Sequence, residues 1–147
     1  MKIICIFTRN LQQQITMIQR FEPVEGRNAE IIECVLNCPE MAGLSDDILF
    51  KIRLCVEEVE ENILCYSGST WVEVTVERKS GEITLGFRDG GVEFNPLAKD
   101  DPDINAPLEN RQVGGLGIFI CKQMMDVVEY ERQGNDNVLK MRIAVKL

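Results

Sequence analysis

The sequence predicts a two-layer α/β (α+β) sandwich, in which a mixed, largely antiparallel sheet carries helices on one face. Two pairs of segments alternate between apolar and polar residues across short turns, as the strands of half-buried hairpins do. Three further segments predict helices, two from apolar residues at steps of three and four and one from a nearly continuous apolar run. Each strand pattern has one polar face, so the helices are expected to pack on the other face only. No repeat or low-complexity linker divides the 147 residues, and we expect one domain.

The first 40 residues predict a strand, an ambiguous segment and a helix. Residues 2–8 are short, apolar and β-branched, which indicates a strand that is central or well covered. Residues 10–20 fit either a helix or an extended segment, and Pro23 and Gly26 then break the chain. Residues 27–37 space their apolar side chains as a helix does, and Pro39 ends it.

Residues 45–66 predict an amphipathic helix. Apolar side chains recur along one face from Ile48 to Tyr66, Ser45 is a favourable N-cap, and Gly68 closes the helix. On a helical projection Glu58 and Asn62 lie next to each other on one shoulder of the apolar stripe, and Glu60 lies on the opposite shoulder.

The rest of the chain predicts two hairpins, separated by a long loop and a helix. Residues 71–77 and 82–88 form the first hairpin, and residues 127–132 and 139–147 form the second, with residues 133–137 as its turn. Residues 95–113 show no periodicity and carry three prolines, which is typical of a lid, a binding loop or a disordered segment. Residues 118–126 are apolar nearly all round and predict a buried helix.

Composition excludes several classes of function. The formal net charge of −8 opposes direct binding to nucleic acids and to anionic membrane surfaces. No apolar run is long enough to span a bilayer and the N-terminus lacks a secretory pattern, so we expect a soluble cytoplasmic protein. The chain has no histidine, which excludes Ser-His and Cys-His catalysis. Its six cysteines contain no CxxC pair and are interpreted as small buried hydrophobic residues.

Glu58 and Asn62 form the first cluster of side chains that could take part in catalysis or metal binding. A carboxylate can act as a general base, and an amide oxygen is a hard ligand that suits Mg²⁺. One helical turn separates the two residues, so a base and a metal can serve one reacting group. Taken alone, the pair is also what a solvated, Glu-rich helix carries.

Asp89, Gly91, Phe94 and Asn95 form the second cluster, at the end of a strand. The aspartate can accept a hydrogen bond from an exocyclic amino group, and a glycine beside it lets a flat ring approach the backbone. A polar turn after a strand is the alternative interpretation.

The third cluster is Gly114-Gly115-Leu116-Gly117 at the start of a helix, where exposed N–H groups and the helix dipole favour an anion. A dinucleotide fingerprint would need glycine at position 120, which is isoleucine, and the P-loop pattern is absent from the chain. A simple helix cap is the alternative interpretation.

Together, the order and spacing of these clusters resemble the GHKL (Bergerat-fold) ATP-binding family. Within that family the chain is similar to the small anti-sigma-factor serine/threonine kinases, above all in the stretch GGLGIFICKQMMDVVEY. The resemblance extends from Leu44 to the C-terminus.

The resemblance implies a role for each cluster. Glu58 corresponds to the catalytic base, Asn62 to the Mg²⁺ ligand, Asp89 to the adenine-binding acid and Gly91 to its companion glycine. Gly115 and Gly117 correspond to glycines on the phosphate side, and the matched motifs make Phe94, Gly114 and Leu116 further nucleotide-binding candidates. Asn95 replaces the more usual aspartate of the motif.

The resemblance also implies a partner. In that family ATP phosphorylates a serine of a STAS-type anti-anti-sigma protein, and the kinase, often a homodimer, otherwise holds a sigma factor. We therefore expect ATP and Mg²⁺ as cofactors, and a role in transcription regulation. An ATP- or ADP-sensing module without phosphotransfer and a carboxylate hydrolase using Glu58 and Asp89 are the alternatives; the few aromatic residues disfavour the hydrolase.

Overall fold

The computed structural model describes residues 6–10, 14–26, 28–107 and 116–146. Its strands are β1 (Ile6–Asn10), β2 (Gln14–Phe21), β3 (Val72–Lys79), β4 (Glu82–Asp89), β5 (Val127–Gln133) and β6 (Asp136–Ala144). Its helices are α1 (Asn28–Leu36), the 3₁₀ turn η1 (Pro39–Met41), α2 (Asp46–Asn62), the π-helical turn η2 (Ile63–Ser67) and α3 (Leu116–Met124).

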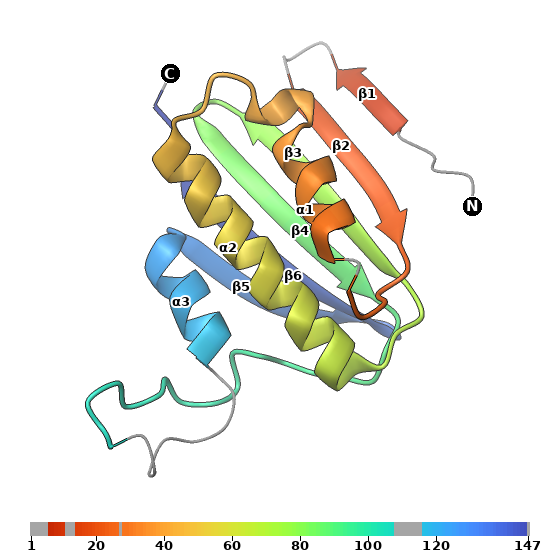
Figure 1. Ribbon diagram of the computed structural model, residues 1–147. Coiled ribbons are helices and arrows are strands. Elements are labelled where there is room, and N and C mark those ends of the chain that lie inside the picture. Colours follow the sequence, from red (N-terminus) through yellow and green to blue (C-terminus); the bar gives the residue numbers. More distant parts are fainter. Residues whose placement is uncertain (1–5, 11–13, 27, 108–115, 147) are drawn as a thin grey trace.

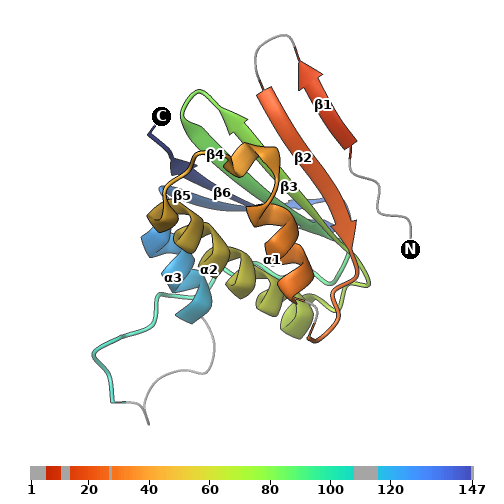
Figure 2. The same cartoon turned by 45° about the horizontal axis from the view of Figure 1, so that its top comes forward.

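The sheet has the strand order β1-β2-β3-β4-β6-β5, and every pairing between described strands is antiparallel. The three α-helices lie on the same side of this sheet in Figures 1 and 2, which confirms the predicted two-layer sandwich. A parallel pairing, which a mixed sheet would require, does not occur among the described strands.

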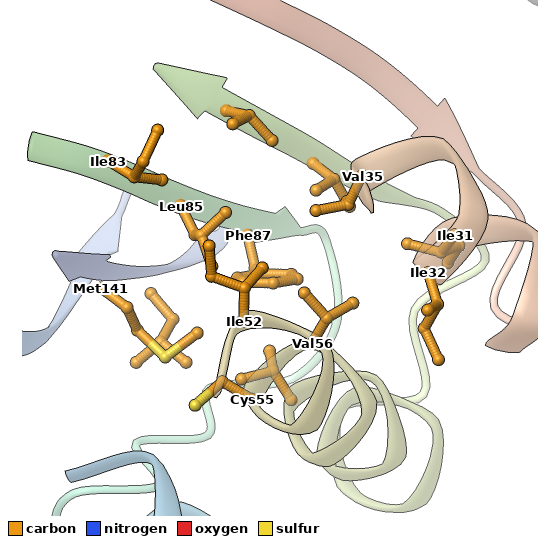
Figure 3. Close-up of a cluster of buried hydrophobic side chains, with 14 of the residues drawn as sticks. Ile31, Ile32, Val35, Ile52, Cys55, Val56, Ile83, Leu85, Phe87 and Met141 are labelled. Carbon is orange, nitrogen blue, oxygen red and sulfur yellow. The ribbon is translucent and has the colours of Figure 1, made fainter. Parts of the chain in front are cut away.

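The core fills the space between the helices and the sheet. In β3 and β4 the alternating residues Val72, Val74, Val76, Ile83, Leu85 and Phe87 are buried, as the hairpin pattern predicted. Figure 3 shows Ile52 and Val56 of α2 packed against Leu85 and Phe87 of β4. Burying such a side chain fully contributes about 1.5–3 kcal/mol, so this face fixes α2 on the sheet.

The first strand differs from its prediction. Residues 2–8 were expected to form a central or well-covered strand. The described strand β1, Ile6–Asn10, instead lies at the edge of the sheet and pairs with β2. An apolar, β-branched run reports burial tendency and does not reveal how many neighbours a strand has. The ambiguous residues 10–20 are extended: in β2, Met17, Gln19 and Phe21 are buried alternately.

Helix α2 begins and ends as its sequence signals indicated. The Ser45 side chain accepts a hydrogen bond from the Ile48 N–H at 3.3 Å, and Gly68 adopts the left-handed conformation with φ 66°. The last turn is π-helical, however, so the helical spacing changes after Asn62. Tyr66, predicted to continue the apolar stripe, is therefore turned outward and is 45% exposed.

Helix α3 is less buried than the sequence indicated. Residues 118–126 were expected to be covered on all sides, but Ile118 and Cys121 are the buried residues of α3, and Leu116 is 51% exposed. The helix packs beside α2 and covers the β5–β6 end of the sheet, so its outer face has no element over it among the described residues.

No helix within the described residues combines the length and the apolar character that crossing a membrane requires. None of the five described cysteines takes part in a disulfide; Cys38, Cys55 and Cys121 are buried, as predicted, whereas Cys65 is exposed.

Candidate functional site

Two adjoining hollows lie at one end of the molecule. Figure 1 shows the C-terminal end of α2, the start of α3 and the loop after β4 together at this end. The first hollow is called here the Asp89 hollow. Its lining is mostly apolar, with a few polar groups: Val59, Asn62, Ile63, Ser67, Phe87, Asp89, Phe94, Pro96, Tyr130, Asn137 and Leu139.

The second hollow is called the Lys99 hollow. It is lined by Asn62, Tyr66, Phe94, Asn95, Pro96, Lys99 and Ile118. The two hollows share Asn62, Phe94 and Pro96, so they adjoin. The amide of Asn62 therefore stands between a hollow with a buried carboxylate and a hollow with a cation.

Asp89 is the last residue of β4 and is 3% exposed. Its Oδ1 accepts hydrogen bonds from the Gly91 N–H at 3.0 Å and from the Asn137 side-chain amide at 3.1 Å. A carboxylate has acceptor capacity on both oxygens, so Oδ2 is available to a hydrogen-bond donor in the hollow. Next to apolar side chains, such an acceptor can bind the amino group of a flat heteroaromatic ring.

Gly91 holds the loop after β4 against the end of α2. A Cβ at this position would overlap the main-chain carbonyl of Ser67, and the next residue, Val92, donates its N–H to that carbonyl at 2.9 Å. Only glycine permits so close an approach. The sequence predicted that a flat ligand ring would approach the backbone at Gly91. In the structure the main-chain carbonyl of Ser67 occupies that space.

Phe94 forms the wall between the two hollows. Its ring stacks on that of Tyr66, with centroids 4.9 Å apart and an interplanar angle of 19°. Stacked aromatic pairs contribute about 0.5–1.5 kcal/mol beyond the area they bury, so this contact helps to fix the loop on the π-helical turn.

Glu58 lies on the α3 side of α2. A Cβ at Gly117, the second residue of α3, would overlap the Glu58 carboxylate, so the helix start and the carboxylate are in direct contact. Partial burial raises the pKa of Glu58 above its ordinary value, and the negative charges of Glu57 and Glu61 raise it further. A carboxylate with a raised pKa is a better proton acceptor. Glu58 does not itself line either hollow.

The structure thus brings most of the predicted site residues to one end of the molecule. Asn62, Asp89 and Phe94 line one hollow, Gly91 bonds to Asp89, and Gly117 contacts Glu58. Leu116 is exposed at the start of α3. Gly114 and Gly115 lie outside the described residues, so their role stays a prediction.

The residues present allow one type of magnesium binding. The described part of the chain contains no group of three or more histidine, cysteine or acidic side chains arranged to hold a metal. A metal cage made wholly of protein side chains therefore does not fit these residues. A single ligand such as Asn62 fits a Mg²⁺ ion that takes its other ligands from phosphates and water.

Sequence reasoning missed Asn137, which lines the Asp89 hollow and bonds to Asp89. It placed this residue in the turn, but the turn is the two-residue Gly134-Asn135, and β6 begins at Asp136. A Gly-Asn pair is a known two-residue hairpin signal. That signal would have placed Asn137 on a strand, although its position opposite Asp89 depends on long-range pairing.

Comparisons with known proteins agree with this geometry. A family model described as a histidine kinase-like ATPase domain matches residues 24–143, a span that includes both hollows and Glu58. The chain is also similar to the serine/threonine-protein kinase BtrW of Bordetella bronchiseptica, with 24% identity over 96 residues. That match covers 63% of this chain and 68% of BtrW.

Proposed function

The chain belongs to the family of histidine kinase-like ATPase domains, and we propose that it transfers the γ-phosphate of ATP to a serine or threonine of a protein partner. Family membership supports ATP binding, and the likeness to a serine/threonine kinase supports a protein as the phosphate acceptor. The site supports the same function through three features: the Asp89 hollow for a nucleobase, Asn62 as a metal ligand, and the Glu58 carboxylate beside the start of α3.

The adenine base binds in the Asp89 hollow. Asp89 accepts from the amino group of the base, while Val59, Ile63 and Leu139 supply apolar contact. The triphosphate extends toward the Lys99 hollow, where Lys99 offers a positive charge in a chain whose net charge is negative. The Gly114–Gly117 turn is the predicted source of N–H donors for the phosphates.

Glu58 and Asn62 carry the chemistry. Asn62 would hold Mg²⁺, which would supply positive charge to the phosphates when bound with the nucleotide. Glu58 accepts the proton of the attacking hydroxyl while the hydroxyl oxygen bonds to the γ-phosphorus, with ADP as the leaving group. The single observation that carries this proposal is the contact between the Glu58 carboxylate and Gly117, which puts a proton acceptor beside the turn that we propose for the phosphates.

The protein partner follows from the family resemblance of the sequence. We propose a STAS-type anti-anti-sigma protein as the phosphate acceptor and a sigma factor as the alternative binding partner, with the kinase as a homodimer. Such a protein would regulate transcription without contacting nucleic acid itself, in keeping with its negative charge.

A nucleotide sensor without phosphotransfer is the second candidate. One observation favours it: Glu58 does not line either hollow, although Asn62, one turn further along α2, lines both. A sensor needs the Asp89 hollow and does not need a base at Glu58.

Phosphotransfer to a STAS-type protein from γ-labelled ATP separates the two candidates. Glu58→Gln keeps the size of the side chain and removes the base, so labelling should fall about 10²- to 10⁴-fold while ATP binding persists. Glu33→Gln, on the exposed face of α1, is the matched control and should label as wild type does. Equal labelling by wild type and Glu58→Gln would remove Glu58 from the mechanism, and absence of labelling with ATP bound would leave the sensor.

A further inference from the structure

Asn137 lies opposite Asp89 in the β4–β6 pairing and is buried, with 5% of its surface exposed. Its side-chain amide donates one hydrogen bond to Asp89 Oδ1 at 3.1 Å and another to the Val92 carbonyl at 2.8 Å. Both amide hydrogens are therefore engaged, one by the carboxylate in the hollow and one by the loop that closes it.

The oxygen of the same side chain is held from the other side. Asn137 Oδ1 accepts from the Tyr130 hydroxyl at 2.7 Å, from Arg132 Nη1 at 3.0 Å and from the Phe94 N–H at 3.1 Å. Three donors converge on this oxygen, so a flipped amide, with its NH₂ group facing them, would lose all three hydrogen bonds. The direction in which Asn137 presents its NH₂ group is thus fixed by β5 and by the loop.

Arg132 extends the same network. Its Nη1 also donates to the Gly91 carbonyl at 3.0 Å, and Gly91 in turn donates its N–H to Asp89 Oδ1. Burial raises the pKa of Tyr130, which keeps its hydroxyl protonated and able to donate at neutral pH.

The consequence falls on Asp89. Two N–H donors, from Gly91 and Asn137, occupy Oδ1. This leaves Oδ2, an acceptor, as the oxygen for a ligand in the hollow. A purine with an amino group at this point donates to Oδ2, whereas a purine with a carbonyl there places one acceptor against another.

We propose that Asn137, held by Tyr130 and Arg132, is a positioning residue that fixes the Asp89 carboxylate and so selects an amino-bearing base such as adenine over a carbonyl-bearing base such as hypoxanthine. The inference rests on the proposed nucleotide site and adds to it the residues that determine base selectivity. Asn137 acts through Asp89 and through the loop, and not by contact with the base.

The test compares the dissociation constants of ATP and ITP, measured by calorimetry, for wild type and three variants. ITP carries a carbonyl where ATP carries the amino group. Asn137→Ala removes the donor to Asp89 and should weaken ATP binding about tenfold or more, with a much smaller change for ITP, because hydrogen bonds to charged groups are among the stronger ones. The preference for ATP, expressed as Kd(ITP)/Kd(ATP), should therefore fall.

Two further variants keep the test decisive if Asn137→Ala proves unstable. Tyr130→Phe deletes one hydroxyl that holds the amide and should lower Kd(ITP)/Kd(ATP) by a smaller factor. Asn135→Ala, at the exposed tip of the same hairpin, is the matched control and should leave the ratio unchanged. Each variant's melting temperature reports whether it is folded.

The possible results are distinguishable. A loss of ATP/ITP discrimination in Asn137→Ala or Tyr130→Phe supports the inference. If both variants bound ATP and ITP with an unchanged Kd(ITP)/Kd(ATP), whether or not both affinities fell equally, the inference would be overturned while the nucleotide site itself stands. Wild-type protein that bound neither nucleotide would overturn the proposed function and this inference with it.

Discussion

Gly117 at the start of α3 lies so close to the Glu58 carboxylate on α2 that a Cβ at position 117 would overlap the carboxylate. Gly117 belongs to the glycine cluster that the sequence analysis predicts to bind phosphates, and Glu58 is the predicted catalytic base. The glycine therefore has a packing role that the sequence alone did not indicate: it lets the helix start approach the carboxylate.

Gly117→Ala should push the Glu58 carboxylate aside, because its methyl group would overlap the end of that side chain. The side chain is flexible, so the loss in the free energy of unfolding should be about 1 kcal/mol or less, the lower end of the usual cost of overpacking. In a Glu58→Ala background the same substitution should cost little, since the carboxylate is gone. Urea unfolding of the wild type, both single variants and the double variant measures this coupling. Equal destabilisation in both backgrounds would show that the two residues do not press on one another.

Phosphotransfer should increase with pH through the pKa of Glu58, because a base must be deprotonated to accept a proton. Burial and the charges of Glu57 and Glu61 raise that pKa, so the midpoint should lie above the ordinary glutamate value of 4.5. Glu61→Gln removes one of these charges and should move the midpoint to lower pH. Initial labelling rates between about pH 4.5 and 8 give both profiles, and a profile unmoved by Glu61→Gln would count against Glu58 as the titrating group.

Glu60 is a buried carboxyl group with 5% of its surface exposed, and neither oxygen has a hydrogen-bond partner among the described residues. Burial raises its pKa to about 8, with a smaller contribution from Glu57. Between the ordinary value of 4.5 and about 8 the folded protein keeps a proton that the unfolded chain releases, so stability falls as pH rises through this range.

Glu60→Met should therefore stabilise the protein, and more at pH 8 than at pH 5. The gain should be about 1–3 kcal/mol, the usual cost of an unsatisfied buried polar group. Melting temperatures at the two pH values measure it, with the exposed Glu33→Gln as the surface control. A gain that did not depend on pH would contradict the raised pKa.

The sequence predicted the fold well where local pattern decides it. Val72, Val74 and Val76 alternate and are buried, and Ser45 and Gly68 mark the ends of the helical segment between them. Local pattern does not encode which strand lies at an edge, so the place of β1 was wrong. It also cannot foresee a π-helical turn, which moved Tyr66 out of the apolar stripe and onto Phe94.

The sequence predicted the motif residues of the site but not the residues that hold them in position. Asp89 and Asn62 were found because they stand in recognisable spacings. Tyr130 and Arg132 both donate to Asn137 within the β5–β6 hairpin. Asn137 in turn donates to Asp89 across the β4–β6 pairing, which joins distant segments, and no local pattern reports such a contact. Glu60 was placed on a shoulder of the helix, where the sequence could not show that α1 and β3 would enclose it.

The central claim is that the Asp89 hollow is the ATP site, and a calorimetric titration of wild type and Asp89→Asn with Mg-ATP tests it most directly. An asparagine can keep its oxygen on the Gly91 and Asn137 donors, and it then turns an NH₂ group toward the amino group of the base. We expect micromolar-scale binding by wild type, a stabilisation of about 2.7 kcal/mol at a hundredfold excess over Kd, and binding at least about tenfold weaker in the variant. No heat and no thermal shift with wild type, or equal affinity in Asp89→Asn, would contradict the account.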